Sequence, residues 1–372
     1  MKDVFNRDNI ALCGRHIAAH HTGFDSKTFD DIATNELENR ELKDRANQIC
    51  KALSATLPKD FAAAKDILLA SFRPVKDNQE LSDVTTDEEG VAGWMILPYS
   101  QFIGEHGQHS VEASLDALRL MTKRFSSEFG IRYFFLEHPK ATLAIVARWT
   151  QDPCHHVRRL VSEGCRPLLP WAMQLPDFKQ DPTHISPLLE ALKDDPSEYV
   201  RRSVANNLND IAKNHPQWVA DLVEQWMVGA DKHRMKLIKH GCRTLVKQGQ
   251  PKVLRLFGFA PASAIESEIS VLEPSITLGD SLVIGAVLTN TTSQKSKVLL
   301  DFVVYHKKAN GKLAPKVFKW KELTLAANAT VQLEKSHPIK AITTRKYYTG
   351  EHQVALQING EVQPPIDFYL TC

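Results

Sequence analysis

The spacing of apolar residues divides the chain into two regions. In residues 41–58 the apolar positions fall three or four residues apart, and the pattern ends at Pro58. Residues 61–72 and 109–139 continue this spacing, and no segment of alternating apolar and polar residues competes with it. The sequence therefore predicts that residues 1–258 are helical.

Beyond Pro261 the pattern changes to short apolar runs and apolar–polar alternation, which are typical of β-strands. The clearest segments are residues 281–292, 297–312, 330–339 and 352–361. Two of them contain an Asn-Gly pair, Asn310-Gly311 and Asn359-Gly360, which is a strong hairpin signal. About seven strands in roughly 100 residues predict an immunoglobulin-like sandwich. We therefore expect a multidomain chain, with an all-α repeat domain over residues 1–261 and an all-β sandwich over residues 262–372.

The helical region contains an internal repeat. Residues 152–159 align with residues 195–202 at a shift of 43, so that an Asp-Pro pair and a Val-Arg-Arg triplet coincide. A weaker third copy follows at a further shift of 34, where Lys236 takes the place of the last arginine. A helix, a turn that opens with Asp-Pro and a second helix are typical of HEAT repeats, whose stacked helix pairs share one core. The Asp of each pair is expected to cap the second helix.

The net charge is +2, from 46 Lys and Arg against 44 Asp and Glu, and by itself it indicates no particular partner. Its distribution is uneven, because the net charge is −6 over residues 1–138, +6 over residues 139–258 and +2 over residues 259–372. The positive charge is therefore concentrated in the repeats. A polyanion such as nucleic acid is expected to bind there.

Cationic side chains occupy related positions on the second helix of each repeat and beyond it: Arg159 and Arg166, Arg202 and Lys213, and Lys236, Arg243 and Lys247. Second helices line the inner surface of such solenoids, so these residues are expected to form a basic groove that binds a phosphate backbone. The alternative is that they only solvate exposed helix faces. Three sets in register favour the groove.

Three residues of this region carry candidate chemistry. Glu163 lies between Arg159 and Arg166, where it either forms an i, i+4 ion pair with Arg159 or has a chemical task. Asp210 follows an Asn-rich stretch and is either part of a polar network or a reacting group. Trp171 is either a packing lid or a face that stacks on a base or sugar.

Several function classes find no support in the sequence. The six cysteines lie far apart, which is typical of reduced thiols, and the adjacent Cys154, His155 and His156 cannot converge on one metal ion. A Gly-rich phosphate loop, GxSxG and HExxH are all absent. The sequence also has neither a secretory leader nor an apolar run of about 18 residues. We expect a cytoplasmic protein without a metal or cofactor.

The whole chain resembles the AlkC branch of the AlkC/AlkD DNA alkylation-repair glycosylases. The matching segments are ELKDRANQICKALSATLPKDF from residue 41, FSSEFGIRYF at 125–134, HHVRRLVSEGCRPLLPW at 155–171, EYVRRSVANNLNDIAK at 198–213, HKKANGKLAPKVFKWK at 306–321 and TTRKYYTGEH at 343–352. The resemblance implies a HEAT-like solenoid that binds DNA in its concave groove and an immunoglobulin-like domain that helps to hold the duplex. It also implies catalytic carboxylates at Glu128, Glu163 and Asp210 and a contact to the base or sugar at Trp171.

The resemblance further implies a monomeric, bacterial base-excision repair enzyme that is a monofunctional DNA glycosylase. Such an enzyme hydrolyses the N-glycosidic bond of cationic alkylated bases in double-stranded DNA, such as 3-methyladenine, 3-methylcytosine and 1-methyladenine, without flipping the base. It would be cytoplasmic, and nucleoid-associated when bound to DNA. The preference among these bases and the carboxylate that acts on water stay open. The alternatives are a non-enzymatic HEAT-repeat protein scaffold and a DNA-binding protein without catalysis.

Overall fold

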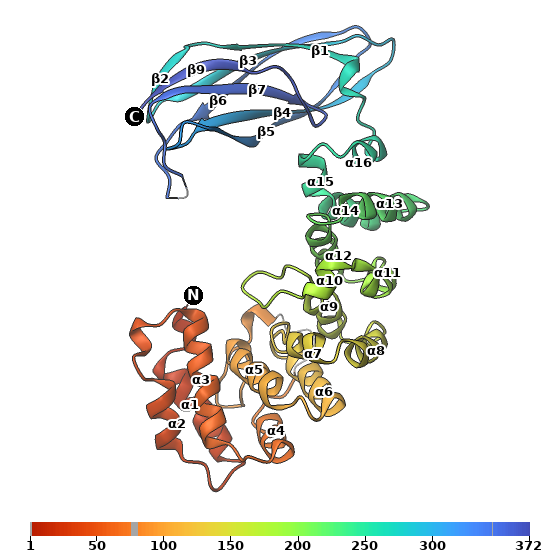
Figure 1. Cartoon of the computed structure of the whole chain (residues 1–372). Coiled ribbons are helices and arrows are strands. Elements are labelled where there is room, and N and C mark those ends of the chain that lie inside the picture. Colours follow the sequence, from red (N-terminus) through yellow and green to blue (C-terminus); the bar gives the residue numbers. More distant parts are fainter. Residues whose placement is uncertain (1, 76–80, 344) are drawn as a thin grey trace. The chain divides into compact units, whose positions relative to one another are not determined.

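The helices come first along the chain, and the strands follow them (Figure 1). The computed structural model describes residues 2–75, 81–343 and 345–372. The α-helices are α1 (Arg7–Ala18), α2 (Ser26–Ala33), α3 (Leu42–Thr56), α4 (Phe61–Ala70), α5 (Ile96–His106), α6 (Val111–Thr122), α7 (Ile131–Glu137), α8 (Pro139–Trp149), α9 (His155–Gly164), α10 (Pro176–Gln180), α11 (Ser186–Leu192), α12 (Glu198–Ile211), α13 (Pro216–Met227), α14 (Lys232–Gly241), α15 (Arg243–Lys247) and α16 (Pro251–Leu256). The strands are β1 (Ile265–Val271), β2 (Ser275–Thr277), β3 (Ser281–Asn290), β4 (Ser296–Lys307), β5 (Leu313–Leu325), β6 (Thr330–Pro338), β7 (Gly350–Ile358), β8 (Glu361–Val362) and β9 (Ile366–Thr371). The predicted fold class is confirmed: an all-α HEAT-like region precedes an all-β immunoglobulin-like sandwich.

The chain forms two compact units. The first unit comprises Met1–Asn214 and Ala230–Gly241, and the second comprises His215–Gly229 and Cys242–Cys372. Helix α14 packs on α12 within the first unit, whereas α13 packs on α16 within the second. The predicted domain boundary between residues 261 and 262 lies inside the second unit and stays a prediction.

The helical segment predicted over residues 109–139 is interrupted. A loop at residues 123–130 separates α6 from α7 and carries Glu128. In this loop the backbone N–H of Ser127 donates to Thr122 Oγ1 at 3.0 Å, which replaces a helical hydrogen bond. Gly130 lies so close to the backbone of Ser100 on α5 that a Cβ atom would overlap it. Because apolar residues continue at helical spacing through the loop, the pattern did not reveal the break.

The first two copies of the internal repeat correspond to helix pairs, α8 with α9 and α11 with α12. The third copy falls on α13 and α14, which belong to different units. The prediction that the Asp residues cap the second helices is wrong. Asp152 accepts from the backbone N–H of Cys154 and Asp195 from that of Ser197, both at 2.8 Å, in the turn before the helix begins. Asp195 also binds Arg158 of the preceding copy through two hydrogen bonds of 2.6 and 3.0 Å. The Asp residues therefore order the turn, and Asp195 also joins neighbouring repeats.

The sandwich consists of two sheets. One has the strand order β1-β3-β6 and the other the order β2-β9-β7-β4-β5, with β8 beside β7. Among these pairs only β2 and β9 run parallel. The four predicted segments coincide with β3, β4, β6 and β7. Asn359 and Gly360 both adopt positive φ angles, 46° and 83°, as a tight hairpin turn requires.

A close backbone contact lies within the second unit, between the segment after α15 and the β7–β8 turn. Gly249 and Gly360 approach each other so closely that a Cβ atom on either would overlap the opposite backbone. The side chain of Asn359 donates to Ala260 O at 2.7 Å and accepts from the backbone N–H of Leu299 at 2.7 Å. The last helices and the sandwich are therefore joined by backbone-level packing.

The cysteines are free thiols, and Cys13, Cys50, Cys165 and Cys242 are buried, which agrees with the sequence prediction. Burial raises the pKa of Cys13, Cys165 and Cys242 to about 12, so these thiols stay protonated. Throughout the described segments, every helix is too short or too polar to cross a membrane.

Candidate active site

A cavity of about 770 Å³ lies in the first unit. Its walls come from α3, α5, the loop at residues 123–130, α9, the segment at residues 165–175 and the start of α12. Apolar side chains such as Leu42, Trp94 and Phe125 supply much of the lining. The lining also includes charged residues, namely Lys43, Glu128, Arg159, Glu163 and Arg166. The cavity therefore joins an apolar interior to a dense cluster of charges, as is typical of a binding site.

The charged side chains form one connected series of ion pairs. Arg159 binds Glu128 and lies 3.3 Å from Glu163. Arg166 binds Glu163 at 2.6 Å and Asp210 at 2.9 Å. The i, i+4 pair between Arg159 and Glu163 that the spacing predicts is therefore present, and it belongs to a larger network that includes Arg166 and all three candidate carboxylates.

Local structure holds these side chains in place. Glu163 lies in the last turn of α9 and Asp210 in the last turn of α12, so Arg166, just beyond α9, can reach both. Ser203 Oγ on α12 donates to Glu163 at 2.6 Å, and Ser126 Oγ donates to Glu128 at 2.7 Å. The network thus connects the loop at residues 123–130 with the second helices of two repeats.

Most of the network is buried, with exposed fractions of 2% for Asp210, 5% for Glu163 and 7% for Arg166. Burial opposes ionisation of Glu163, but Arg159, Arg166 and Ser203 outweigh it and hold the pKa of this carboxyl below its ordinary value. Burial also opposes the charge on Arg166, but Glu163 and Asp210 outweigh it and raise the pKa of Arg166. Glu163 and Arg166 are therefore charged at neutral pH.

Glu128 differs from the other two carboxylates in its hydrogen bonding. Both oxygens of Glu163 and both oxygens of Asp210 accept from side-chain donors. Glu128 accepts from Ser126 and Arg159 through Oε2 alone, so within the described part of the chain its Oε1 has no hydrogen-bond partner. Because Glu128 also lines the cavity, this oxygen can accept from a bound molecule.

Trp171 lies in the segment between α9 and α10. Its side chain is 63% exposed, and its backbone adopts a left-handed φ of 64°. A tryptophan with this exposure is not a packing lid. It lines the cavity together with Glu128 and Glu163, so a stacking role stays the prediction for this residue.

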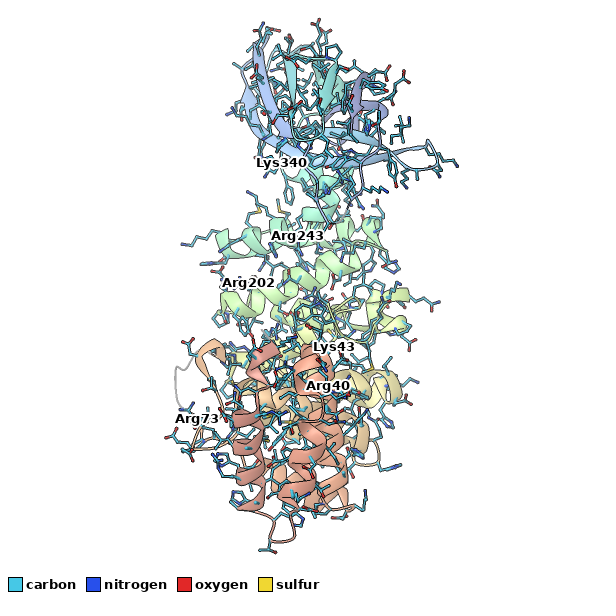
Figure 2. The ribbon with its side chains drawn as sticks, turned by 90° about the vertical axis from the view of Figure 1, so that its left-hand side faces the viewer. Arg40, Lys43, Arg73, Arg202, Arg243 and Lys340 are labelled. Carbon is cyan, nitrogen blue, oxygen red and sulfur yellow. The ribbon has the colours of Figure 1, made fainter. Side chains whose placement is uncertain are left out.

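The cations predicted to contact phosphate lie in different settings. Arg159 and Arg166 belong to the ion-pair network. The others are exposed: Arg202, Lys213 and Lys236 in the first unit, and Arg243 and Lys247 in the second. Of these, Lys213 also binds Asp210 of the network at 3.0 Å. Figure 2 labels Arg202 on α12 and Arg243 on α15. Phosphate binding by these residues stays a prediction.

Comparisons with known proteins identify both parts of the chain. The model of the DNA alkylation repair enzyme family matches residues 124–241, and the model of the C-terminal Ig-like domain of uncharacterised protein YhaZ matches residues 266–372. Uncharacterized protein YhaZ of Bacillus subtilis strain 168 is 34% identical over 372 residues, which cover 99% of this chain and 98% of that protein. The structure of Pseudomonas fluorescens alkylpurine DNA glycosylase AlkC bound to DNA containing an abasic site analog is 32% identical, has a TM-score of 0.86 and covers 100% of this chain and 99% of its own.

The chain belongs to the AlkC branch of the DNA alkylation repair enzymes. The similarity to AlkC supports DNA glycosylase activity. The matching segment that begins at Thr343 includes Thr344, which lies outside the described residues.

Several residues at the site of this AlkC-branch protein escaped the sequence analysis. The ring of Tyr199 lines the cavity, and Arg159 Cζ lies 5.2 Å from its centroid. Ser126 and Ser203 hold two of the carboxylates, and Ser126 could have been suspected from its place two residues before Glu128. Over the residues that the structure describes, no group of three His, Cys, Asp or Glu side chains is placed to hold a metal ion.

Proposed function

We propose that this protein is a monofunctional glycosylase that hydrolyses the N-glycosidic bond of cationic alkylated bases in double-stranded DNA. The observation that supports this most directly is Glu128 Oε1, which lies at the cavity beside two further carboxylates and has no hydrogen-bond partner among the residues that the structure describes. The Pseudomonas fluorescens relative is an alkylpurine DNA glycosylase and is bound to DNA, which supports DNA as the partner. The proposed substrates are 3-methyladenine, 3-methylcytosine and 1-methyladenine.

The chemistry of these substrates suits a negatively charged site. An alkylated base that already carries a positive charge leaves without prior protonation. As the bond breaks, positive charge develops on the deoxyribose, and nearby carboxylates stabilise it. The exposed face of Trp171 can add a cation–π attraction.

The three carboxylates are proposed to have different tasks. Glu128 orients the attacking water and accepts its proton, because its Oε1 is not hydrogen-bonded to any described residue. Glu163 and Asp210 are saturated with donors and act through their charge. Arg159 and Arg166 keep Glu163 ionised when DNA is absent.

The exposed cations are proposed to bind the phosphate backbone of the duplex. Arg202, Lys213 and Lys236 of the first unit, with Arg243 and Lys247 of the second, would bind phosphates, and the immunoglobulin-like domain would assist them. The network cations Arg159 and Arg166 would approach the backbone only near the damaged nucleotide. We propose a monomer that acts without flipping the base.

The test is release of methylated base from an alkylated duplex, measured in single turnovers. Glu128→Gln is expected to lower the rate by about 100-fold or more, and Asp210→Asn by a similar factor, while duplex binding is nearly unchanged. Glu137→Gln, an exposed carboxylate on α7, is the matched control and should behave like the wild type.

The same assay separates the alternatives. A protein scaffold would neither bind the duplex nor release a base, and a DNA-binding protein without catalysis would only bind. Wild-type activity in the Glu128→Gln/Asp210→Asn double variant would refute the assignment of these carboxylates.

A further inference from the structure

The loop that carries Trp171, residues 165–175, is anchored at its base by a buried arginine. Arg132 on α7 is fully buried and donates to Gly164 O at 2.9 Å, Arg166 O at 2.8 Å and Met173 O at 2.6 Å. Burial lowers the pKa of Arg132 to about 10, so the group remains charged at neutral pH. Both ends of the loop are therefore tied to one side chain.

The tip of the loop has a second anchor from a distant helix. Lys43, in the first turn of α3, donates from Nζ to the backbone carbonyl of Trp171 at 2.6 Å. Figure 2 labels Lys43 on this helix. Both residues line the cavity, so this hydrogen bond closes its rim between α3 and the loop.

Trp171 needs such an anchor for two reasons. Its φ of 64° lies in the left-handed region, which a bulky side chain adopts only when its surroundings enforce it. Its side chain is 63% exposed, so packing does little to fix the ring. A hydrogen bond to its own carbonyl restrains the peptide unit on which the direction of the ring depends.

We propose that Lys43 is a positioning residue for base release, and that it acts by holding Trp171 in its left-handed conformation at the cavity. The proposal rests on the proposed glycosylase function for its kinetic consequence, but not for its structural one. The alternative for an exposed lysine in a DNA-repair protein is a direct phosphate contact, and it predicts different results.

The kinetic test is a double-variant cycle on an alkylated duplex in single turnovers. Lys43→Met is expected to lower the rate of base release about fivefold in the wild-type background, with unchanged duplex affinity. In a Trp171→Ala background the same substitution should have no further effect, because the residue through which Lys43 acts is gone. Lys43→Arg should restore most of the rate, and Lys51→Met, an exposed lysine farther along α3, is the matched control.

Two results would overturn the proposal. One is an equal loss of rate in both backgrounds. The other is a Lys43→Met variant that binds all duplexes more weakly, with a salt dependence reduced by about one ion, as a phosphate contact requires.

A second measurement does not depend on activity. The fluorescence of Trp171 is obtained as the difference between the full chain and its Trp171→Phe variant, and its quenching by acrylamide is compared with and without Lys43→Met. We expect the quenching to increase when Lys43 is replaced and to stay constant for Lys51→Met. Unchanged quenching refutes the anchor, whereas increased quenching in a protein that releases no base refutes the glycosylase function and leaves the anchor intact.

Discussion

The buried charge network of the first unit and the buried histidines of the second unit differ in protonation state. In the first unit, Glu163 and Arg166 are almost fully buried as a charged pair. In the second unit, burial and then the neighbouring Arg345 lower the pKa of His306 to about 3, and burial and the same arginine lower that of His337 to about 4. His306 and His337 of the sandwich are therefore neutral, whereas Glu163 of the first unit is ionised.

The difference shows what these two sets of polar groups are used for. Neutral histidines pack against aromatic rings, such as Phe318, whose centroid lies 4.3 Å from that of His337. Buried charges contribute little to stability on balance, because the cost of desolvation offsets their attraction. A cluster of buried charges is therefore better explained by chemistry at the cavity than by a need for stability.

The largest effect is expected when the charged pairing is broken. Arg166→Ala leaves Glu163 and Asp210 buried without their shared partner, and it should lower the free energy of unfolding by about 3 to 5 kcal/mol. Urea denaturation followed by helical circular dichroism measures this loss. Arg202→Ala, on an exposed position of α12, should change stability by less than about 0.5 kcal/mol. A similar loss in the free energy of unfolding for both variants would show that Arg166 does not stabilise the two buried carboxylates.

The neutral histidines predict a dependence on pH in the second unit. The ordinary pKa is 6.5, and both folded values lie below it. The unfolded chain therefore takes up protons first, and the stability that is present above pH 6.5 is lost as the pH falls towards the folded values. Each histidine alone would contribute about 2 kcal/mol between pH 7 and pH 5, and because His337 is partly exposed we expect a combined loss of about 2 to 4 kcal/mol. Urea titrations of the full chain at both values measure it, and a His306→Gln/His337→Gln variant should lose less.

A smaller effect is expected at the joint between repeats. Arg158→Lys keeps the charge but removes the two-pronged contact with Asp195, and it should cost about 1 to 2 kcal/mol. Thermal unfolding of the full chain checks this value. Arg148→Lys, a change on an exposed position of α8, serves as a matched control that leaves the joint intact, and an equal shift in both variants would contradict the prediction.

The smallest effect on stability is expected for an exposed ion pair. Lys236 binds Glu198 at 2.6 Å, and both side chains are more than half exposed, so Lys236→Ala should change stability by less than about 0.5 kcal/mol. Duplex binding should nevertheless weaken for every sequence, with a salt dependence that falls by about one ion. Titrations at several salt concentrations measure this slope, and an unchanged slope would remove Lys236 from the proposed groove.

Much of the fold could be predicted because it depends on local patterns. The helix at residues 42–56 and the strand at residues 281–290 follow directly from apolar spacing, and the Asn359-Gly360 turn follows from its residue types. The break after Thr122 could not be predicted, because apolar spacing continues through it. It depends on a hydroxyl hydrogen bond and on a close contact of Gly130 with α5, which the pattern does not record.

The site likewise combines contacts that local spacing predicts with contacts that form only in the folded chain. Spacing alone predicts the pair of Arg159 and Glu163, which lie one helical turn apart. The contacts of Arg166 with Asp210 and of Lys43 with Trp171 join residues 44 and 128 positions apart, so only the folded chain brings them together. The availability of Glu128 Oε1 depends on where the donors of neighbouring elements lie, and no motif encodes it.

The contact between Gly249 and Gly360 limits how this protein can evolve. A mutation that gives either residue a side chain places atoms inside the backbone of the other, and both residues adopt backbone angles that favour glycine. Neither glycine can therefore be replaced by another residue without displacing the backbone of the other, although 111 positions separate them. If recombination replaced the sandwich alone, the new β7–β8 turn would have to fit against the retained Gly249. The sandwich and the segment after α15 are therefore expected to be inherited together.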